Sequence, residues 1–207
     1  MSNLKIKLLD SSQKIEKNIL AASEKEIKTL FQRAKPKIES EIKQLIVEAL
    51  SSCPEILSLK SGQLKYDFGL VIDPADDIIY SVANSTHVIF KNFRFTKQEV
   101  KNVFSVYIQS STFNNLLNLA VANVITENGE VLPWLEWLLT AGDAVVILDY
   151  SVEYGRNSNS RTGNAIMVPG GFFRVDPKYS GTVENNFITR ALEKYPPKIE
   201  EIIRRNI

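Results

Sequence analysis

The most informative part of the sequence is Leu132-Pro133-Trp134-Leu135-Glu136-Trp137-Leu138-Leu139, an apolar block that precedes a strand, a polar loop and a closing helix. Pro133 suits the first turn of a helix and Gly142 suits its end, so the block predicts a short helix over 134–140. Both tryptophans of the chain lie there, three residues apart, and only one helical face can turn inward. The block therefore indicates a surface that another protein covers.

The residues that follow predict a strand over 144–154 and a glycine-rich polar loop over 155–171. Two further strands, 165–168 and 172–175, flank Pro169-Gly170-Gly171, whose turn chemistry predicts a hairpin. The loop lacks the Gly-Lys-Ser or Gly-Lys-Thr ending of a phosphate cradle, and it carries no residue suited to covalent chemistry. Arg156 and Arg161 could grip a carboxylate or phosphate of a partner, because guanidinium offers paired donors.

The aromatic residues around this loop are the candidate anchors of an interface, because tryptophan and other large aromatic side chains often dominate binding energy. They are Trp134, Trp137, Phe172 and Phe173. Thr182, with Glu184 or Asn185, is expected to open the last helix. Its apolar positions include Phe187, and a second helical segment is expected after Pro196-Pro197.

The first quarter of the chain predicts helix over 12–50, because apolar residues recur there at three- and four-residue steps. Pro36 lacks an amide hydrogen, so this is either two helices or one kinked helix, and Pro54 prevents continuation beyond Cys53. Strands are predicted over 64–72, 78–82, 87–95 and 100–109. Ser111 could cap a short helix through Ala122, and 127–130 predicts a turn.

These elements predict one α+β domain over 1–207. Its expected parts are a kinked N-terminal helix, a mostly antiparallel sheet with a long β-hairpin arm, and a C-terminal helix packed on the sheet. Residues 155–181 are expected to protrude as a loop or hairpin arm.

Composition excludes several classes of function. The net charge of +1 gives no global field that would draw the chain onto nucleic acid or an anionic membrane. One cysteine and one histidine cannot build a disulfide framework or the common zinc sites, which suits a reducing compartment. The first ten residues do not resemble a signal peptide, and the apolar runs are too short for a membrane span.

Enzymatic chemistry finds little support in the sequence. Cys53 and His87 are the only candidates for a thiol nucleophile and its imidazole base, and no Gly-x-Ser-x-Gly elbow is present. Asp73, Asp76 and Asp77 could hold a hard cation, but the glycine and final glutamate of a calcium loop are missing and Pro74 already explains a turn. We therefore expect no catalytic residue, no metal and no cofactor.

With this order of elements in hand, the chain resembles the tail-completion or head-tail joining proteins of tailed bacteriophages. Pro54 and Ser61-Gly62-Gln63-Leu64 echo, at a longer spacing, the Pro and Gly-x-Leu that enter the first strand of that family. Trp134, Glu136, Trp137 and Gly142 echo its aromatic and glutamate before a glycine turn. The phrase Asn186-Phe187-Ile188-Thr189-Arg190-Ala191-Leu192 resembles its final helix with a proline replaced, and 95–132 looks like an insertion.

The resemblance implies a structural virion protein of the neck or tail terminus, without enzymatic activity, that forms a ring of six copies. Its implied partners are sister copies, the connector, the tail tube and the tail sheath, with DNA passing through unbound and no membrane involved. It implies residence in the virion, and in the host bacterial cytoplasm during assembly. The expected contacts lie in the aromatic block, the loop and the last helix: Trp134, Trp137, Arg156, Arg161, Phe172, Phe173, Phe187 and Arg190.

Two alternatives from other classes stay open at this point. One is a small metal-dependent hydrolase or nuclease-like enzyme that uses Asp73, Asp76 or Asp77 with a divalent cation. The other is a cytoplasmic adaptor that binds an acidic peptide through Arg156 and Arg161.

Overall fold

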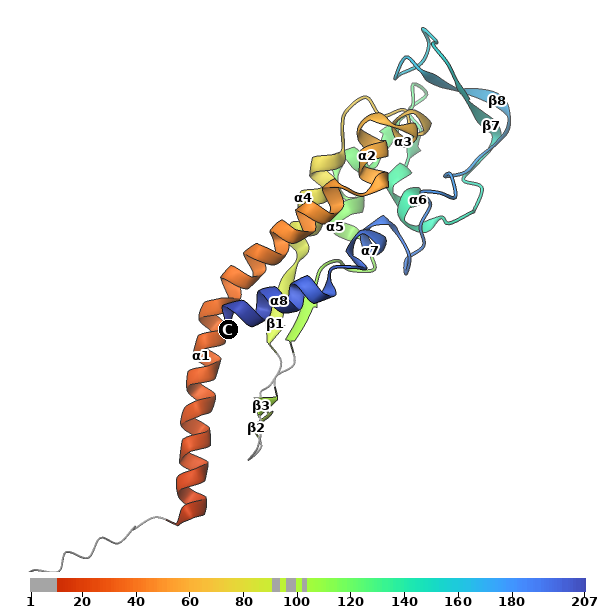
Figure 1. Cartoon of the computed structure of the whole chain (residues 1–207). Helices are drawn as coiled ribbons and strands as arrows, with labels where there is room; N and C mark the ends of the chain where they lie inside the picture. Colours follow the sequence, from red (N-terminus) through yellow and green to blue (C-terminus); the bar gives the residue numbers. More distant parts are fainter. Residues whose placement is uncertain (1–10, 91–93, 96–99, 102–103) are drawn as a thin grey trace, which may run out of the picture.

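The protein is elongated, with a long N-terminal helix at one end and a β-hairpin at the other (Figure 1). This arrangement comes from a computed structural model, which describes residues 11–90, 94–95, 100–101 and 104–207. The body between the two ends holds one hydrophobic core whose members run from Ile38 on the first helix to Ile202 on the last. The predicted α+β class, with its long N-terminal helix and antiparallel strand pairing, is confirmed.

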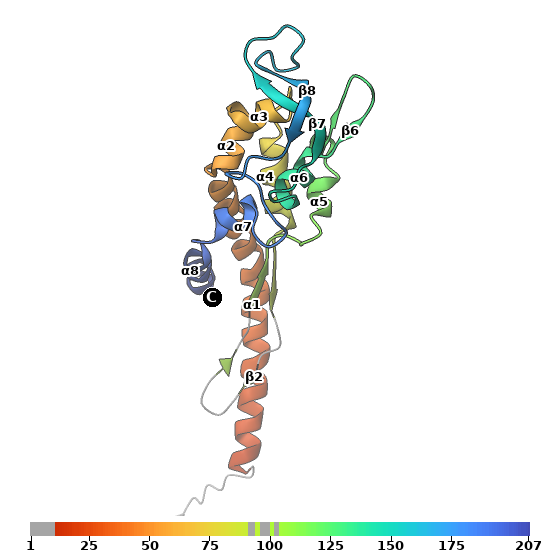
Figure 2. The ribbon, with the colours of Figure 1, turned by 90° about the vertical axis from the view of Figure 1, so that its right-hand side faces the viewer.

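The first helix, α1 (Ser12–Ser51), is one continuous helix of 40 residues. The Ser11 hydroxyl caps it by accepting from the backbone N–H of Lys14 at 3.3 Å. Pro36 lies inside it, and Figure 1 shows the axis changing direction partway along, so the kinked helix is the correct one of the two predicted forms. Figure 2 shows the first part of α1 extending well away from the body.

The next three elements are helices: α2 (Pro54–Ser61), α3 (Gln63–Asp67) and α4 (Ala75–Ser85). The strands predicted over 64–72 and 78–82 are therefore wrong. In α4, Ile78, Ile79, Val82 and Ala83 are all buried, which is a three- and four-residue spacing. A short apolar run without polar alternation fits a buried helix as well as a strand, and packing against α1 decided for the helix.

The described strands form two-stranded antiparallel ribbons, and no wider sheet is present among the described residues. β1 (His87–Phe90) pairs with β4 (Phe104–Tyr107), and β2 (Arg94–Phe95) pairs with β3 (Val100–Lys101). The strands predicted over 87–95 and 100–109 are confirmed for these residues, while 91–93, 96–99 and 102–103 lie outside the described chain. β5 (Val124–Ile125) pairs with β6 (Val131–Leu132), which confirms the turn predicted at 127–130.

The helix predicted from Ser111 to Ala122 is split into α5 (Asn114–Leu117) and a 3₁₀ turn, η1 (Ala120–Ala122). Its N-cap is Phe113, with a left-handed φ of 51°, and not Ser111. The aromatic block forms α6 (Trp134–Thr140), as predicted.

The largest ribbon is the hairpin of β7 (Ile147–Tyr154) and β8 (Ala165–Phe173). The hairpin predicted to turn at Pro169-Gly170-Gly171 is wrong, because β8 continues through these residues with a register irregularity opposite Asp149, and the turn lies at 155–164. Pro169 is paired in register with Tyr150, and Gly171 lies against Ser151, where an added Cβ would come within 3.3 Å. Strand pairing thus overrode the local turn signal.

The chain closes with α7 (Phe187–Leu192) and α8 (Pro196–Asn206). The prediction that the C-terminal helix packs on the sheet is wrong: α8 packs against α1, where Arg205 Nη2 donates to Glu41 Oε2 at 2.7 Å. This ion pair lowers the pKa of Glu41 and raises that of Arg205. α7 is capped by Asn186, and not by Thr182 as predicted, in a reciprocal pair with Thr189.

Candidate interaction surfaces

The hairpin projects from the body, and its tip is the polar loop that the sequence predicts (Figure 1). Backbone hydrogen bonds brace this loop, among them one from Gly155 N–H to Asn164 O at 2.9 Å and one from Gly163 N–H to Ser160 O at 3.2 Å. The Ser160 hydroxyl also donates to Ala165 O. The observed hairpin spans 147–173, so it lies nearer the N-terminus than the arm predicted over 155–181.

Two side-chain hydrogen bonds tie α3 to the hairpin and to the loop that follows it. The Tyr154 hydroxyl donates to the carboxylate of Asp67, and Gln63 Nε2 donates to Asp176 Oδ2 at 3.1 Å. Burial raises the pKa of the Asp67 carboxyl, and the bonds from Tyr154 and Gln63 oppose that rise. The pKa of Tyr154 is also raised, first by burial and then by the Asp67 carboxylate.

A cleft of about 760 Å³ lies between this hairpin, α3, α6 and the β5–β6 turn. Its floor is aromatic: Trp134 and Phe68 lie with ring centroids 5.2 Å apart, and Phe68 meets Phe173 edge-on at 6.2 Å. Its rim is polar and includes the loop residues 158–161. The cleft is thus an apolar hollow with a hydrogen-bonding border.

Three of the aromatic candidates belong to the core of the chain. Trp134 and Phe187 are fully buried, and Phe173 is only 6% exposed. The indole N–H of Trp134 donates to Val121 O at 2.8 Å, so its one polar atom is satisfied inside the chain. Packing within the body accounts for the burial of these three residues. Trp137 is half-buried and lines the cleft.

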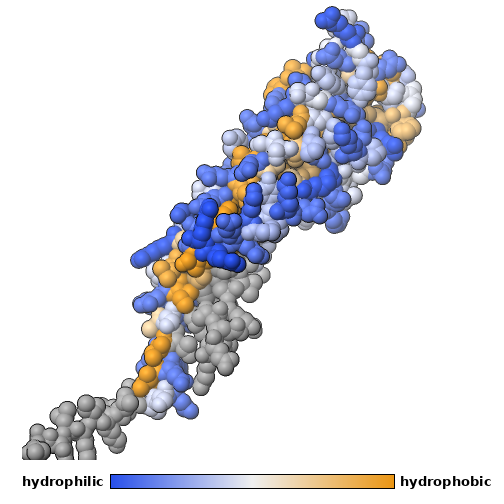
Figure 3. Space-filling model, in the orientation of Figure 1, coloured by the Kyte–Doolittle hydropathy of each residue, from blue (hydrophilic) through white to orange (hydrophobic). Residues whose placement is uncertain are grey.

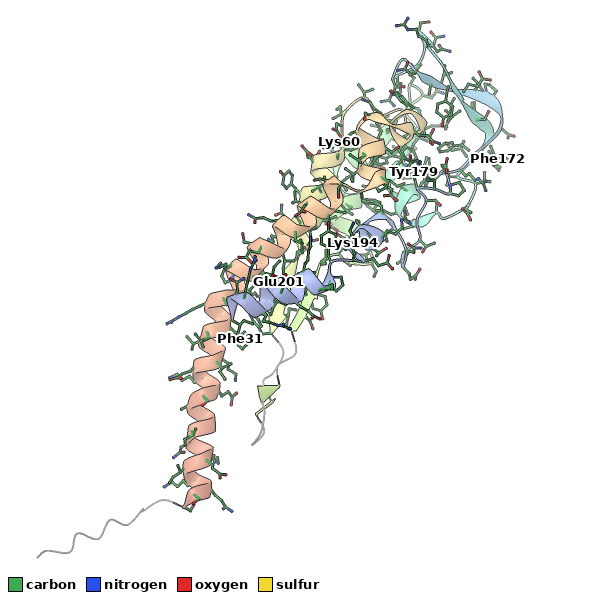
Figure 4. All side chains as sticks on the ribbon, viewed as in Figure 1. Phe31, Lys60, Phe172, Tyr179, Lys194 and Glu201 are labelled. Carbon is green, nitrogen blue, oxygen red and sulfur yellow. The ribbon has the colours of Figure 1, made fainter. Side chains whose placement is uncertain are left out.

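Arg190 acts as a clamp inside the chain. Its Nη2 donates to Glu55 Oε1 at 2.7 Å and to Tyr179 O at 3.0 Å, while its Nη1 donates to Ser180 O at 3.2 Å. Glu55 is almost wholly buried, so this ion pair holds the loop before α7 onto the start of α2. Figure 4 shows Tyr179 in this loop. Arg190 thus has a structural role in the chain that the sequence did not indicate.

The remaining candidates lie at the surface. Arg156 is exposed at the hairpin tip, and Arg161 is exposed at the rim of the cleft, where its Nη1 donates to Ile125 O at 2.9 Å. Phe172 is 55% exposed, and Figure 4 shows it on the outer side of the hairpin. Of the eight candidates, the structure brings Trp134, Trp137, Arg161 and Phe173 together around the cleft.

Exposed apolar side chains mark both ends of the molecule. On the hairpin, Leu148 is 72% exposed, and Tyr150 and Tyr154 are also exposed. On the first part of α1, Ile19 is 60% and Leu30 is 54% exposed. Figure 3 shows hydrophobic side chains running along this part of α1. Large contiguous apolar exposure marks interaction sites on soluble proteins.

Cys53 and His87 were weighed as a nucleophile and its base, and the structure shows the surroundings of each. Cys53 is buried where α1 meets α2, and burial raises the pKa of its thiol to about 11, which keeps it in the unreactive neutral form. The His87 ring stacks on Tyr107 at 5.2 Å, and its Nδ1 lies 3.0 Å from Ser85 O.

The acidic residues Asp73, Asp76 and Asp77 lie at the N-terminal end of α4. Asp73 Oδ1 accepts from the Ala75 N–H at 2.9 Å, and Asp76 lies 3.4 Å from Lys60 Nζ. Asp76 and Asp77 stand in the first turn, where a helix favours negative charge. Within the described part of the chain, no group of three or more histidine, cysteine, aspartate or glutamate side chains could hold a metal ion.

Sequence reasoning missed three residues that hold the hairpin and loop in place. Glu55 and Asp67 are buried carboxylates whose partners lie far away in the chain, so no local pattern marks them. Gly181 is buried against Asn186, whose Cα would lie 2.8 Å from an added Cβ. The sequence does mark Gly181, because a glycine beside polar residues and shortly before a helix indicates a close approach between backbone segments.

Comparison with protein families, with curated proteins and with solved structures found no match to this chain. No helix among the residues with described positions is long and apolar enough to cross a membrane.

Proposed function

We propose that this protein is a structural subunit of the neck or tail terminus of a tailed bacteriophage, forming a ring that joins head and tail or caps the tail tube. The observation that carries the proposal is the exposure of apolar side chains on two elements that project from opposite ends of the body: the first part of α1 and the β7–β8 hairpin. An isolated subunit leaves both surfaces in water, and association would cover them.

Two different surfaces at opposite ends favour contacts between unlike patches. A contact of that kind repeats from copy to copy, and it closes into a ring when the rotation between copies allows it. A ring of six copies is what the resemblance to head-tail joining proteins implies. Leu148 and Phe172 on the hairpin, with Ile19 and Leu30 on α1, are the side chains we expect such contacts to bury.

The charge of the chain suits a ring through which DNA passes. Basic and acidic residues number 25 and 24, so the ring as a whole would carry little net charge. Binding of DNA depends on neutralising its phosphates with lysine and arginine. A nearly neutral subunit would let DNA move through the channel without holding it.

The experiment that tests this function is a measurement of mass at rising protein concentration, followed by electron microscopy with tail-tube or connector proteins added. The expected result is a discrete oligomer and closed rings at the end of tails. A chain that stays monomeric at every concentration, and forms no ring when tail proteins are present, would contradict the proposal. A hairpin variant, Leu148→Ser, serves as the matched sample with reduced apolar exposure.

A further inference from the structure

The free edge of β7 is the feature from which a partner segment can be inferred. β7 is paired with β8 and with no other described strand, so its second edge is open. Gly155 N–H donates to Asn164 O, and the alternation of an antiparallel ladder then turns the backbone groups of Tyr150, Val152 and Tyr154 outward. An open strand edge is a template for another strand.

The two edges of the hairpin are not equivalent. On β8, Pro169 faces outward in the same alternation and has no N–H to donate, which blunts that edge. On β7, the register shift between Leu148 and Tyr150, where Asp149 has a left-handed φ of 64°, limits the regular stretch. The acceptor is therefore the run from Tyr150 to Tyr154.

This run has two chemically different faces. Tyr150, Val152 and Tyr154 alternate along one face, whereas Ser151 and Glu153 lie on the other. Both tyrosines and Glu153 are exposed. A strand that fits must therefore carry three apolar residues at a period of two, with positive charge between them.

The chain contains one segment with that pattern outside the described residues. Leu4-Lys5-Ile6-Lys7-Leu8 alternates three apolar residues with two lysines and has the same length as the acceptor run. When Ile6 lies opposite Val152, the apolar residues share the tyrosine face, and one lysine lies beside Glu153 whichever way the strand runs.

A segment from the same molecule cannot reach this edge. α1 has 40 residues, so its two ends lie about 60 Å apart along the helix at ~1.5 Å per residue, and its second end lies inside the body. The hairpin lies beyond that far end (Figure 1). From Leu4 to Ser12 the chain can extend only about 28 Å at roughly 3.5 Å per residue. The strand must come from another copy.

We propose that residues 4–8 of one copy add as a third strand to the β7 edge of a neighbouring copy, over residues 150–154. The inference rests on the proposed function in one respect, which is that copies of this chain associate. Because the donor segment and the acceptor edge lie at opposite ends of the molecule, the contact is head-to-tail and can propagate around a ring.

The test is disulfide trapping between two variants that are purified separately and then mixed under mild oxidation. One carries Ile6→Cys and the other Val152→Cys, and these positions are opposite in both strand directions. Cys53 is retained because it is buried. The control replaces Val152→Cys by Leu57→Cys, an exposed site on α2. The expected result is cross-linking at least tenfold faster for the first pair than for the control pair.

Equal rates for the two pairs would overturn the inference. Rapid cross-linking by Val152→Cys alone would also overturn it, because that would place two hairpins edge to edge. An equilibrium measurement separates this inference from the proposed function. Ile6→Pro, which removes an N–H from the donor, should raise the dissociation constant of the oligomer tenfold or more, whereas Ser2→Pro should not. If Ile6→Pro forms an oligomer as stable as that of the wild type, strand addition by residues 4–8 is contradicted and the proposed ring is not. If the wild-type chain is monomeric, both proposals are contradicted.

Discussion

The β7–β8 hairpin and the segment from Asp176 to Leu192 follow one another in the chain, and they use the same kinds of residue in opposite ways. Each contains aromatic residues, an arginine and a glycine, and the sequence marks both as partner surfaces. In the second segment these side chains face the body: Phe187 is fully buried, and Arg190 donates hydrogen bonds to Glu55 and to loop carbonyls. The hairpin turns Leu148, Tyr150 and Phe172 outward.

Burial, and not residue type, therefore separates a residue that anchors the fold from one that is available to an interface. The contrast is sharpest at one peptide bond, between Phe172 and Phe173. Neighbours in a strand point to opposite faces, so one ring enters the core while the other meets solvent.

The largest effect is expected at this pair of phenylalanines. Phe173→Ala should lower the free energy of unfolding by about 4 kcal/mol, because it leaves a cavity beside Phe68. Phe172→Ala should change it by less than ~0.5 kcal/mol. Urea unfolding of both variants measures the contrast. Equal losses would show that the hairpin is held to the body in a different way.

The clamp should give the next largest effect. Arg190→Ala leaves Glu55 buried without its guanidinium partner, and breaking a buried ion pair in this way costs roughly 3 kcal/mol. Arg156→Ala, at the exposed hairpin tip, is the matched arginine and should stay near the wild-type midpoint. Thermal unfolding of the two variants distinguishes them. An unchanged midpoint for Arg190→Ala would return that residue to the list of partner contacts.

Self-association should depend on the exposed apolar side chains of the hairpin. Leu148→Ser removes a 72%-exposed apolar side chain, so the folded monomer should be little affected. If the Leu148 side chain is buried between copies, the dissociation constant of the variant's oligomer should be about tenfold higher than that of the wild type, which corresponds to ~1.4 kcal/mol. Sedimentation equilibrium measures this change. Tighter association of the variant would contradict an apolar contact at the hairpin.

The smallest effect is a dependence on pH at the base of the hairpin. Burial raises the pKa of Asp67 above its ordinary value of 3.8, so the unfolded chain loses this proton first as pH rises. Stability from this group is therefore complete below 3.8 and declines until the pH passes the folded pKa. Asp67→Asn cannot ionise, and it should gain stability relative to the wild type across that window.

A second variant sharpens this prediction. The Tyr154 hydroxyl donates to Asp67 and lowers its pKa, so Tyr154→Phe should extend the decline to higher pH. Unfolding curves measured at a series of pH values report both changes. A constant difference between Asp67→Asn and the wild type at every pH would show that Asp67 has the same pKa in both states.

Much of the fold could be predicted from local patterns. The spacing of apolar residues in α1, the proline before α6 and the Glu-Asn-Gly turn between β5 and β6 each depend on near neighbours. The strands predicted in place of α3 and α4 were wrong because a short apolar run has no period that separates helix from strand. At Pro169-Gly170-Gly171, pairing of the flanking β8 residues with β7 outweighed the turn signal, and the two glycines form an irregularity within the strand.

The candidate surface was harder to predict for a related reason. Whether Trp134 faces inward depends on contacts with other elements, such as the ring of Phe68 and the carbonyl of Val121. A single sequence carries no sign of those contacts. The sequence patterns that selected the exposed Phe172 and Arg156 as contacts also selected the buried Phe173 and Phe187.

Hydrogen–deuterium exchange measured at low and high protein concentration tests directly whether copies of the chain cover the hairpin. We expect the outward amides of β7, at Tyr150, Val152 and Tyr154, to exchange more slowly at high concentration, while the exchange rates of the α7 amides are unchanged. β7 amides that exchange at one rate across a concentration range in which the mass increases would contradict it, because the hairpin would then remain uncovered in the assembled protein.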